Sequence, residues 1–325
     1  MPVRDFAFYC TDSICDRLVY HCVLEGSCQL WLVHPVPAVL SKTAKHHQQF
    51  NQHFLAAFFC SFKQGYHQFD ALVIASLYAS SRYWQLTGCV RPQGMNFPII
   101  HLQPPSQTPL TRSRKKNSTH ALGLYPVVDH SSWITRLANT GITTLQLRLK
   151  NLPDTLLEQE IARAVRLART HHIRLFINDH WQLAIKHQAY GIHLGQEDLA
   201  TAHIKDIKAA GLQIGVSTHC HFEVAHAISV QPDYLAIGPI FATQTKTMAF
   251  TPQGLAGLHY WRRQLQGPLV AIAGINQNNI DTVIPCIDAQ QDGVALISAI
   301  TQAKHPEATA QNMQRHFIAQ SRHTQ

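Results

Sequence analysis

The stretch FINDHWQLAIKHQAYGIHLGQED, residues 176–198, contains two short apolar runs, and each run leads to an acidic residue. Asp179 ends the first run, and Asp198 comes just after the second. The segment between the two runs has the length and composition of a short helix. A strand, a helix and a second strand in this order form a parallel pair with a crossover helix. The stretch therefore predicts one unit of a parallel α/β fold.

The same alternation continues along the rest of the chain. Eight runs rich in Val, Ile and Leu lie at residues 122–129, 143–150, 173–179, 191–195, 213–219, 234–241, 269–275 and 293–300. In one of the helical patterns between them, four apolar residues share a face: Leu156, Ile161, Ala164 and Leu167. Eight such units in about 200 residues favour an α/β fold of the closed (β/α)8 type, a TIM barrel. An open, doubly wound sheet is the alternative, but no Gly-x-Gly-x-x-Gly motif follows the first run.

Composition limits the class of protein. The 325 residues, 46% of them hydrophobic, are enough for one large domain and a smaller one. No run approaches about 20 apolar residues, and Asp5 interrupts the start of the chain, so we expect no membrane span, no signal peptide and a cytoplasmic location. The eight cysteines include no Cys-x-x-Cys pair, which favours reduced thiols over a zinc site or disulfides.

The net charge of +8 is concentrated before residue 120, where 11 Lys and Arg stand against 5 Asp and Glu. Part of it is the run RSRKK at 112–116, inside a segment rich in Pro, Ser and Thr. No interleaved aromatic residues or nucleic-acid-binding motif accompany this run, so a solvated linker is favoured over a nucleic-acid partner. We therefore predict an amino-terminal region at 1–103, a linker at 104–119 and a barrel at 120–325.

The predicted fold indicates where Asp179 and Asp198 lie. In a TIM barrel the chemistry takes place at the carboxyl ends of the strands. Asp179 closes the third strand and Asp198 follows the fourth, so neighbouring strands bring both carboxylates to one rim. Carboxylate oxygens suit Mg²⁺, which in turn binds phosphorylated substrates. The alternative is that each Asp caps the helix that follows it.

The second strand ends in QLRLK, where period-two alternation directs Gln146, Arg148 and Lys150 to the same side. Arg binds phosphate oxygens bidentately, Lys adds a compact charge, and an amide suits the edge of a heteroaromatic ring. These side chains predict a site for a diphosphate ester. The alternative is that they only extend to the mouth of the barrel to reach water.

Further polar groups follow the later strands. They are the hydroxyl, ammonium and backbone groups of Ser217, Thr243, Thr245, Lys246, Gly274, Ile297 and Ser298. The glycine lets a ligand approach the backbone, and the last strand of a barrel often contributes N–H groups to a phosphate. Ordinary turn chemistry is the alternative for the hydroxyls. Two anion sites predict two phosphorylated small-molecule substrates that meet over the barrel.

Eight segments in order resemble thiamine phosphate synthase over about residues 121–303: LYPVVD, TLQLRLK, LFINDHWQLAIKHQAYGIHLGQEDL, GVSTH, FATQTK, PQGL, AGI and DGVALISAIT. The resemblance implies an enzyme that joins 4-amino-2-methyl-5-hydroxymethylpyrimidine diphosphate to hydroxyethylthiazole phosphate, with Mg²⁺ as cofactor. The products are thiamine monophosphate and pyrophosphate. In this family the pyrophosphate leaves before the thiazole nitrogen attacks, so no covalent nucleophile is implied.

The resemblance also implies a role for each matching position. The implied pyrimidine diphosphate contacts are Gln146, Leu147, Arg148, Leu149, Lys150, Asn178, Ser217 and Lys246. The implied thiazole phosphate contacts are Thr243, Gln244, Thr245, Gly274, Ile297 and Ser298. The implied Mg²⁺ ligands are Asp179 and Asp198, and the implied catalytic residues are Gln146, Arg148, Lys150, Ser217 and Lys246.

Two positions depart from the family's pattern. Leu149 replaces the usual acidic residue of the second-strand motif, and alternation turns it away from the mouth, so we expect the chemistry to be intact. Ala273 replaces the first of two usual glycines after the seventh strand. We expect its methyl group to crowd the phosphate loop and to weaken binding of thiazole phosphate.

Two other functions compete with this reading. One is a noncatalytic, thiazole-phosphate-binding or tautomerase-like relative, but such proteins generally lack the full diphosphate and metal set that this chain keeps. The other is a binding protein recruited through RSRKK, which would show salt-sensitive retention on nucleic acid. The sequence predicts neither nucleic acid nor a membrane as a partner, and it is compatible with a homo-oligomer.

Residues 1–103 lie outside the barrel. Residues 54–82 place Ala71, Ile74, Ala75 and Tyr78 at helical spacing, and they weakly resemble the last helices of hydroxymethylpyrimidine phosphate kinase. That family has a Gly-Thr-Gly-Cys anion hole before these helices, where this chain reads KHHQQFNQHF at 45–54. A loop without glycine does not easily direct backbone amides at a phosphate. We expect a mainly helical, kinase-like extension without activity, and a structural or partner-binding role stays open.

Overall fold

The computed structural model describes residues 7–14, 17–24, 28–37, 44–87, 97–102, 121–243 and 250–323. The chain forms two compact units. One holds Met1–Arg114 with Cys220–Gln231 and Gln264–Gln266, and the other holds Lys115–His219, Pro232–Arg263 and Gly267–Gln325. The predicted linker at 104–119 lies outside the described residues.

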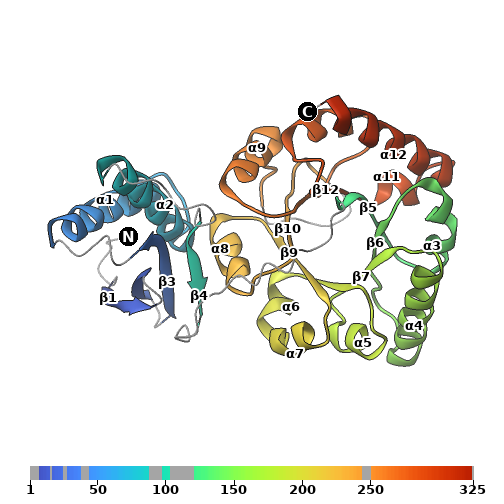
Figure 1. The fold of residues 1–325 in the computed structure, drawn as a ribbon, viewed down its shortest axis with the longest axis horizontal. Helices are drawn as coiled ribbons and strands as arrows, with labels where there is room; N and C mark the ends of the chain where they lie inside the picture. The colour runs from blue at the N-terminus through green and yellow to red at the C-terminus, as the bar shows by residue number, and fades with distance from the viewer. Residues whose placement is uncertain are drawn as a thin grey trace. The chain divides into compact units, whose positions relative to one another are not determined.

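A closed barrel of eight parallel strands dominates residues 121–323 (Figure 1). Its strands are β5 (Gly123–Val128), β6 (Thr144–Leu147), β7 (Arg174–Asn178), β8 (Gly191–Leu194), β9 (Gln213–Thr218), β10 (Tyr234–Ile237), β11 (Leu269–Ala271) and β12 (Gly293–Leu296). They close in the order β10-β11-β12-β5-β6-β7-β8-β9. The predicted TIM barrel is confirmed, and each predicted run contains one strand.

Helices follow the strands and surround them in Figure 1. They are α3 (Ser132–Leu137), η3 (Ala138–Thr140), α4 (Asp154–Thr170), α5 (Trp181–Lys186), α6 (Gln196–Thr201), α7 (Ile204–Ala209), α9 (Gly254–Gln264), α10 (Ile280–Val283), η4 (Ile284–Cys286), α11 (Ser298–Thr301) and α12 (Pro306–His323). Helix α8 (His221–Ser229) follows β9 along the chain and belongs to the other unit. In α4 the predicted Ile161 and Ala164 are buried, but Leu156 is 51% exposed. The helix buries Leu157 instead, because one step along a helix turns a side chain through about 100°.

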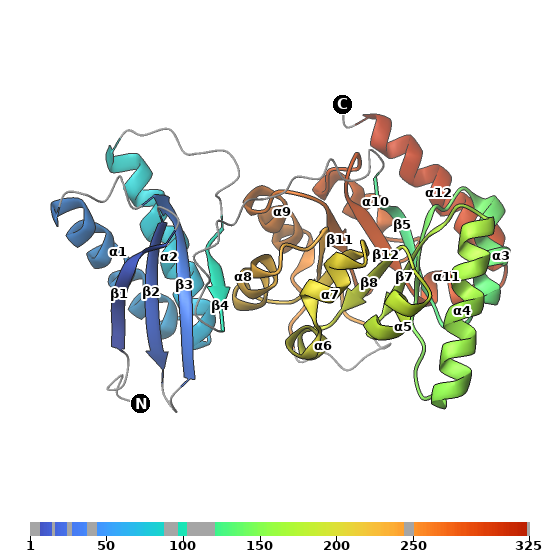
Figure 2. The ribbon, with the colours of Figure 1, turned by 60° about the horizontal axis from the view of Figure 1, so that its bottom comes forward.

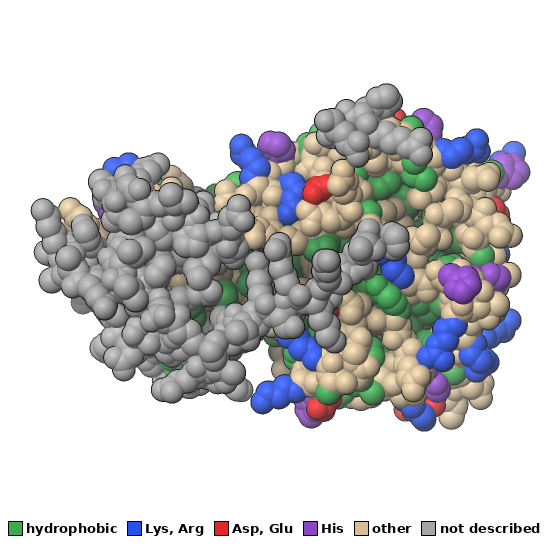
Figure 3. Space-filling model, viewed as in Figure 1, with side chains coloured by type: hydrophobic (Ala, Val, Ile, Leu, Met, Phe, Trp, Pro, Cys, Tyr) green, Lys and Arg blue, Asp and Glu red, His purple; other side chains and the backbone are tan. Residues whose placement is uncertain are grey.

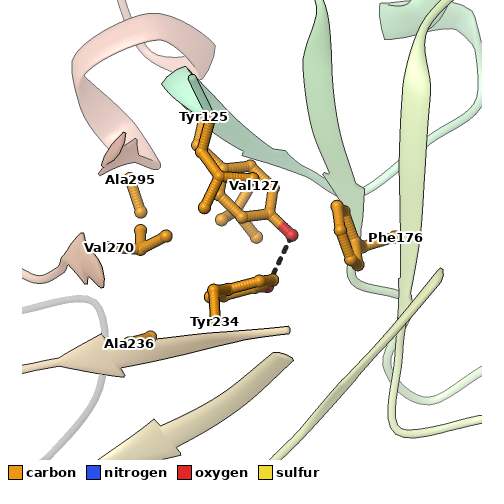
Figure 4. Close-up of a cluster of buried hydrophobic side chains, with 8 residues drawn as sticks. Tyr125, Val127, Phe176, Tyr234, Ala236, Val270 and Ala295 are labelled. Atoms are coloured by element: carbon orange, nitrogen blue, oxygen red, sulfur yellow. Dashed lines mark hydrogen bonds between the residues drawn. The ribbon is translucent and has the colours of Figure 1, made fainter. Parts of the chain in front are cut away.

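Aromatic rings fill the interior of the barrel. Alternate residues of each strand point inward, and the buried cluster comprises Leu122, Tyr125, Val127, Phe176, Tyr234, Ala236, Val270 and Ala295 (Figure 4). Two strand glycines make room for the rings. A Cβ on Gly215 would lie 2.0 Å from Cζ of Tyr234, and a Cβ on Gly191 would lie 2.5 Å from Cε1 of Phe176. Glycine is therefore required at both places for the rings to occupy these positions.

The amino-terminal unit contains an antiparallel sheet as well as helices. Its strands β1 (Ala7–Ile14), β2 (Arg17–Leu24), β3 (Cys28–Pro37) and β4 (Ile99–His101) pair in this order, and its helices are α1 (Ala44–Lys63) and α2 (Gln68–Thr87). Figure 2 shows both helices on one side of the sheet. The helices confirm part of the expectation. The sheet was not predicted, because its strands mix Thr, Asp, Ser and His with apolar residues.

Two finer expectations for this unit need correction. The segment KHHQQFNQHF lies inside α1 and is not a loop. The residues predicted at helical spacing do lie in α2, but they do not share one buried face: Ala71 and Ala75 are buried, whereas Tyr78 is 48% exposed. Cys60, Cys220 and Cys286 are thiols outside any disulfide. In the part of the chain that the structure describes, no helix has both the length and the apolar character needed to cross a membrane.

Candidate active site

Asp179 lies in the turn from β7 to α5, in the left-handed region of backbone space with φ of 65°. Its N–H donates to the carbonyl oxygen of His193 at 2.9 Å, which joins the end of β7 to β8. The turn places an Asp179 carboxylate oxygen 2.7 Å from Nζ of Lys150, and the Asp179 side chain is only 17% exposed. Strained conformations of this kind cluster at functional sites.

Asp198 comes from the next βα unit, at the third residue of α6, and its carboxyl group interacts with that of Asp179. Burial raises the pKa of Asp198, and the charge and hydrogen bond of Asp179 raise it further. Burial acts the same way on Asp179, but the hydrogen bond and charge of Lys150 outweigh it and hold the pKa of Asp179 below its usual range. A second cation near this pair would relieve the remaining repulsion.

The capping alternative explains little of this arrangement. The residues at the N-cap positions of α5 and α6 are His180 and Gly195, and neither makes a side-chain capping hydrogen bond. Asp198 does accept a hydrogen bond from the backbone of Gly195, as the acidic residue of a capping box would. Asp179 has no such role.

Of the polar residues in the QLRLK segment, Gln146 lies within β6, and Arg148 and Lys150 follow its end. Gln146 is 6% exposed, while the side chain of Lys150 is 48% exposed. The Arg148 guanidinium is half-buried and makes no hydrogen bond or ion pair with any described residue. Leu147 and Leu149 are buried at 1% and 3% exposure, so a ligand above the strand would meet them through their backbone.

Ser217, near the end of β9, is held by a buried histidine that was not among the predicted site residues. His193 places Nε2 at 2.7 Å from Oγ of Ser217 and Nδ1 at 2.7 Å from Oη of Tyr234. Burial lowers the pKa of His193 to about 4, against the opposing charge of Asp179. The imidazole is therefore neutral near pH 7. Asn178, at the end of β7, is opposite His193 in the strand register and is 6% exposed.

Two tyrosines continue this set of polar contacts through the barrel. The hydroxyl groups of Tyr125 and Tyr234 are 2.8 Å apart, the contact drawn in Figure 4. Nε2 of Gln146 donates to Oη of Tyr125 at 3.5 Å. Burial raises the pKa of both tyrosines, so both stay protonated. Period-two alternation was the signal that could have placed these side chains inside the barrel.

The loop after β11 holds two successive residues in the left-handed region of backbone space. Ala273 and Gly274 have φ of 73° and 70°. A Cβ on Gly274 would lie 2.6 Å from Cβ of Phe241 and 2.7 Å from the carbonyl oxygen of Ala242, so only glycine fits there. The N–H of Phe241 donates to the carbonyl oxygen of Ala273 at 3.2 Å. This contact joins the loops that follow β10 and β11.

The remaining predicted thiazole phosphate residues are only partly described. Thr243 lies in the loop after β10, Ile297 is 37% exposed just after β12, and Ser298 begins α11. Gln244, Thr245 and Lys246 lie outside the described residues. The structure thus brings together Lys150, Asp179 and Asp198, and it links Gln146 with Ser217 through the tyrosines and His193.

These features define a (β/α)8-barrel protein with a polar site at the carboxyl ends of its strands, the position of the active site in barrel enzymes. The family model described as thiamine monophosphate synthase matches residues 124–300, more than half of the chain. The chain therefore belongs to the thiamine monophosphate synthase family, and it is an enzyme of the transferase class.

Individual relatives agree with this assignment. The thiamine-phosphate synthase of Serratia proteamaculans is 54% identical over 200 residues, which cover 60% of this chain and 92% of that protein. The thiamine-phosphate synthase of Photorhabdus laumondii is 50% identical over 197 residues, 59% of this chain and 88% of that protein. Among solved structures, the thiamine phosphate pyrophosphorylase of Pyrococcus furiosus superimposes with a TM-score of 0.54 at 28% identity, over 61% of this chain and 96% of that one.

Proposed function

We infer that this enzyme couples 4-amino-2-methyl-5-hydroxymethylpyrimidine diphosphate to hydroxyethylthiazole phosphate, and that it releases pyrophosphate and thiamine monophosphate. The observation that carries the proposal is the contact among Lys150, Asp179 and Asp198 at the rim. A noncatalytic protein that binds only a thiazole phosphate has no use for a carboxylate pair held beside an ammonium group.

The donor set at this rim fits Mg²⁺. Among the described residues, no group of three or more His, Cys, Asp or Glu side chains could hold a metal ion. Asp179 and Asp198 would therefore be the two protein ligands of the ion. Mg²⁺ is commonly held by one or two carboxylates, with waters and substrate phosphates completing its shell. When bound, the ion would neutralise charge on the diphosphate and stabilise the departing pyrophosphate.

The reaction needs one bond to break and one to form. The bond between the pyrimidine methylene carbon and the diphosphate oxygen breaks, and its electron pair leaves with pyrophosphate. The thiazole nitrogen then donates its lone pair to the methylene carbon. Arg148 and Lys150 place positive charge beside the leaving oxygens, and Ser217 adds a hydroxyl group. Preorganised donors of this kind stabilise charge that develops in the transition state.

Once pyrophosphate has left, the pyrimidine methylene carbon is a carbocation, and the other residues surround it. Gln146 and Asn178 offer amide groups to the pyrimidine edge, and the buried aromatic cluster around Phe176 limits access of water from inside the barrel. The hydroxyethylthiazole phosphate is assigned to the loops after β10, β11 and β12, through Thr243, Gln244, Thr245, Gly274, Ile297 and Ser298.

The test is synthesis of thiamine monophosphate by purified full-length protein with both substrates and Mg²⁺. Chelation of Mg²⁺ should abolish product formation, and added Mg²⁺ should restore it. Asp179→Asn should raise the Mg²⁺ concentration needed for half-maximal rate, because a neutral amide is a weaker ligand. Arg148→Ala should lower kcat/KM for the pyrimidine diphosphate by at least about 100-fold.

Exposed residues of like type supply the controls. Asp206→Asn in α7 and Arg163→Ala in α4 remove similar groups from exposed helix positions and should leave the rate unchanged. The absence of product with the wild-type protein would overturn the proposed reaction. An unaltered Mg²⁺ dependence in Asp179→Asn would overturn the metal site alone.

A further inference from the structure

Five polar side chains form one continuous hydrogen-bonded path through the barrel. It runs from Gln146 on β6 to Tyr125 on β5, Tyr234 on β10, His193 on β8 and Ser217 on β9. The three contacts from Tyr125 to Ser217 are 2.7 to 2.8 Å long, and the contact at Gln146 is longer, 3.5 Å. Only the two ends of the path belong to the proposed substrate site.

Strand register explains how the path crosses from core to rim. Gly215 is the partner of both His193 on one side and Tyr234 on the other. Because Gly215 has no side chain, the Tyr234 ring occupies the space above it and reaches His193 two strands away. Ser217 is two residues beyond Gly215 on the same face, nearer the carboxyl end of β9. The path therefore rises to the substrate side.

Counting hydrogens gives the path a direction. Either tyrosine can be the donor in the contact between them, and with the Gln146 amide as donor to Tyr125 the Tyr125 hydroxyl proton has Tyr234 as its acceptor among the described residues. Tyr234 is fully buried and has one remaining acceptor in the described structure, Nδ1 of His193. With Nδ1 as the acceptor from Tyr234, the ring proton of His193 is on Nε2, and Nε2 donates it to Ser217. The Ser217 hydroxyl proton is then left for a ligand.

We propose that Tyr125, Tyr234 and His193 are positioning residues that hold Ser217 as a hydrogen-bond donor toward a phosphate oxygen of the pyrimidine diphosphate, and hold Gln146 with its amide oxygen toward the pyrimidine. This role rests on the proposed function. An anion requires donors, and a serine whose proton were committed to His193 would present only lone pairs to it. The buried path therefore makes the Ser217 hydroxyl at the rim a hydrogen-bond donor to the ligand.

The first test needs no substrate. In full-length protein labelled with ¹⁵N-histidine, the His193 signals, assigned by their loss in His193→Asn, should show a protonated Nε2 and an unprotonated Nδ1 near pH 7.5. The opposite tautomer would overturn the direction of the path. In Tyr234→Phe, which removes the donor to Nδ1, the preference for this tautomer should weaken.

The second test is a double-mutant cycle on kcat/KM for the pyrimidine diphosphate. Tyr234→Phe should cost on the order of tenfold in the wild-type background and almost nothing in a Ser217→Ala background. KM for hydroxyethylthiazole phosphate should change little. An equal loss in both backgrounds would mean that Tyr234 acts on the structure in general and would overturn the proposal. Tyr190→Phe, a barrel tyrosine outside the path, is the matched control and should leave kcat/KM unchanged.

Folding of each variant is checked by its melting temperature. Should Tyr234→Phe fail to fold, Tyr125→Phe removes the preceding donor and enters the same cycle, with the same expected dependence on Ser217. A wild-type protein that makes no thiamine monophosphate would defeat the proposed function, whereas the tautomer of His193 would still decide the direction of the path.

Discussion

Ala273 holds a backbone conformation that usually belongs to glycine, with φ of 73°. For a residue with a Cβ this region costs roughly 1–2 kcal/mol, because the Cβ approaches the following carbonyl oxygen. Gly274, next to it, has φ of 70° and no space for a side chain. The loop therefore stores strain at one residue and relies on glycine at the other.

We expect Ala273→Gly to stabilise the protein by about 0.5 to 1 kcal/mol, since relief of strain exceeds the entropy that glycine adds to the unfolded chain. The same change should lower KM for hydroxyethylthiazole phosphate if the methyl group crowds that ligand. Chemical denaturation and steady-state kinetics measure the two effects. The control, Ala162→Gly inside α4, should destabilise by about 0.5 to 1 kcal/mol.

Asp292 is the most completely buried carboxylate of the barrel, with 0% exposure among the described residues. It accepts hydrogen bonds from Nη1 of Arg262 at 2.8 Å and from the N–H groups of Leu269 and Asp288, each at 2.8 Å. Asp292→Asn leaves the guanidinium without its counter-charge, so we expect a loss of about 3 kcal/mol in the free energy of unfolding.

An exposed ion pair gives the comparison. Lys186 and Glu158 lie 2.5 Å apart with side-chain exposures of 60% and 35%, and Lys186→Met should cost less than about 1 kcal/mol. Equal losses of unfolding free energy in Asp292→Asn and Lys186→Met would contradict the claim that the buried ion pair is costlier to break than the exposed one. Thermal and denaturant unfolding of both variants decide this.

Strand β9 contributes to the site through a residue that has no side chain. Gly215 faces into the barrel between His193 and Tyr234 in the register. It allows the tyrosine ring to lie over the strand, and this determines where the Tyr234 hydroxyl meets the imidazole. Strand β9 supplies the Ser217 side chain at the rim, and Gly215, two residues earlier, leaves the space below it. The two residues share a face because side chains alternate along a strand.

Gly215→Ala would place a methyl group 2.0 Å from Cζ of Tyr234, so the ring must move. We expect a loss of about 1 to 3 kcal/mol of stability from overpacking, with a lower kcat/KM for the pyrimidine diphosphate. Stability should return in part when Tyr234→Leu is added, while activity should not. A single variant as stable and active as wild type would show that the ring position is unimportant.

The molecule as a whole carries its synthase-like residues in the barrel. The family model covers residues 124–300, and the Serratia proteamaculans relative is 92% covered by its match to this chain. On the face drawn in Figure 3, the Lys, Arg and His side chains of the barrel lie mostly around its margin, and they do not gather in one patch. This distribution is typical of a solvated surface.

A chain that begins at residue 119 is expected to keep most of the synthase activity, because relatives of nearly barrel length carry the same family name. The measurement is kcat/KM for both substrates, beside the melting temperature, for the shortened and the full-length protein. Activity lost from a shortened chain that remains folded would assign the amino-terminal region a part in catalysis. The kinase-like origin of that region stays a prediction.

The barrel and its rim followed from local patterns in the chain. Alternating apolar runs and helices predict eight strands. Lys150, Asp179 and Asp198 follow three neighbouring strands, so closure of a parallel barrel brings them to the same rim. Helix faces were less certain, as Leu156 shows, because a single-residue offset rotates a side chain out of the core. The strands of the amino-terminal sheet were not predicted, because polar residues interrupt their apolar runs.

The path from Gln146 to Ser217 depended on closure of the barrel. Tyr125 and Tyr234 are separated by 109 positions, and no local periodicity relates them. Their contact arises because β5 and β10 point side chains into one interior, and because Gly215 leaves space there. The opposite pKa shifts of Asp179 and Asp198 likewise depend on burial and on distances across strands. Periodicity is a property of neighbours in sequence, whereas hydrogen bonds and charge interactions depend on distance in space.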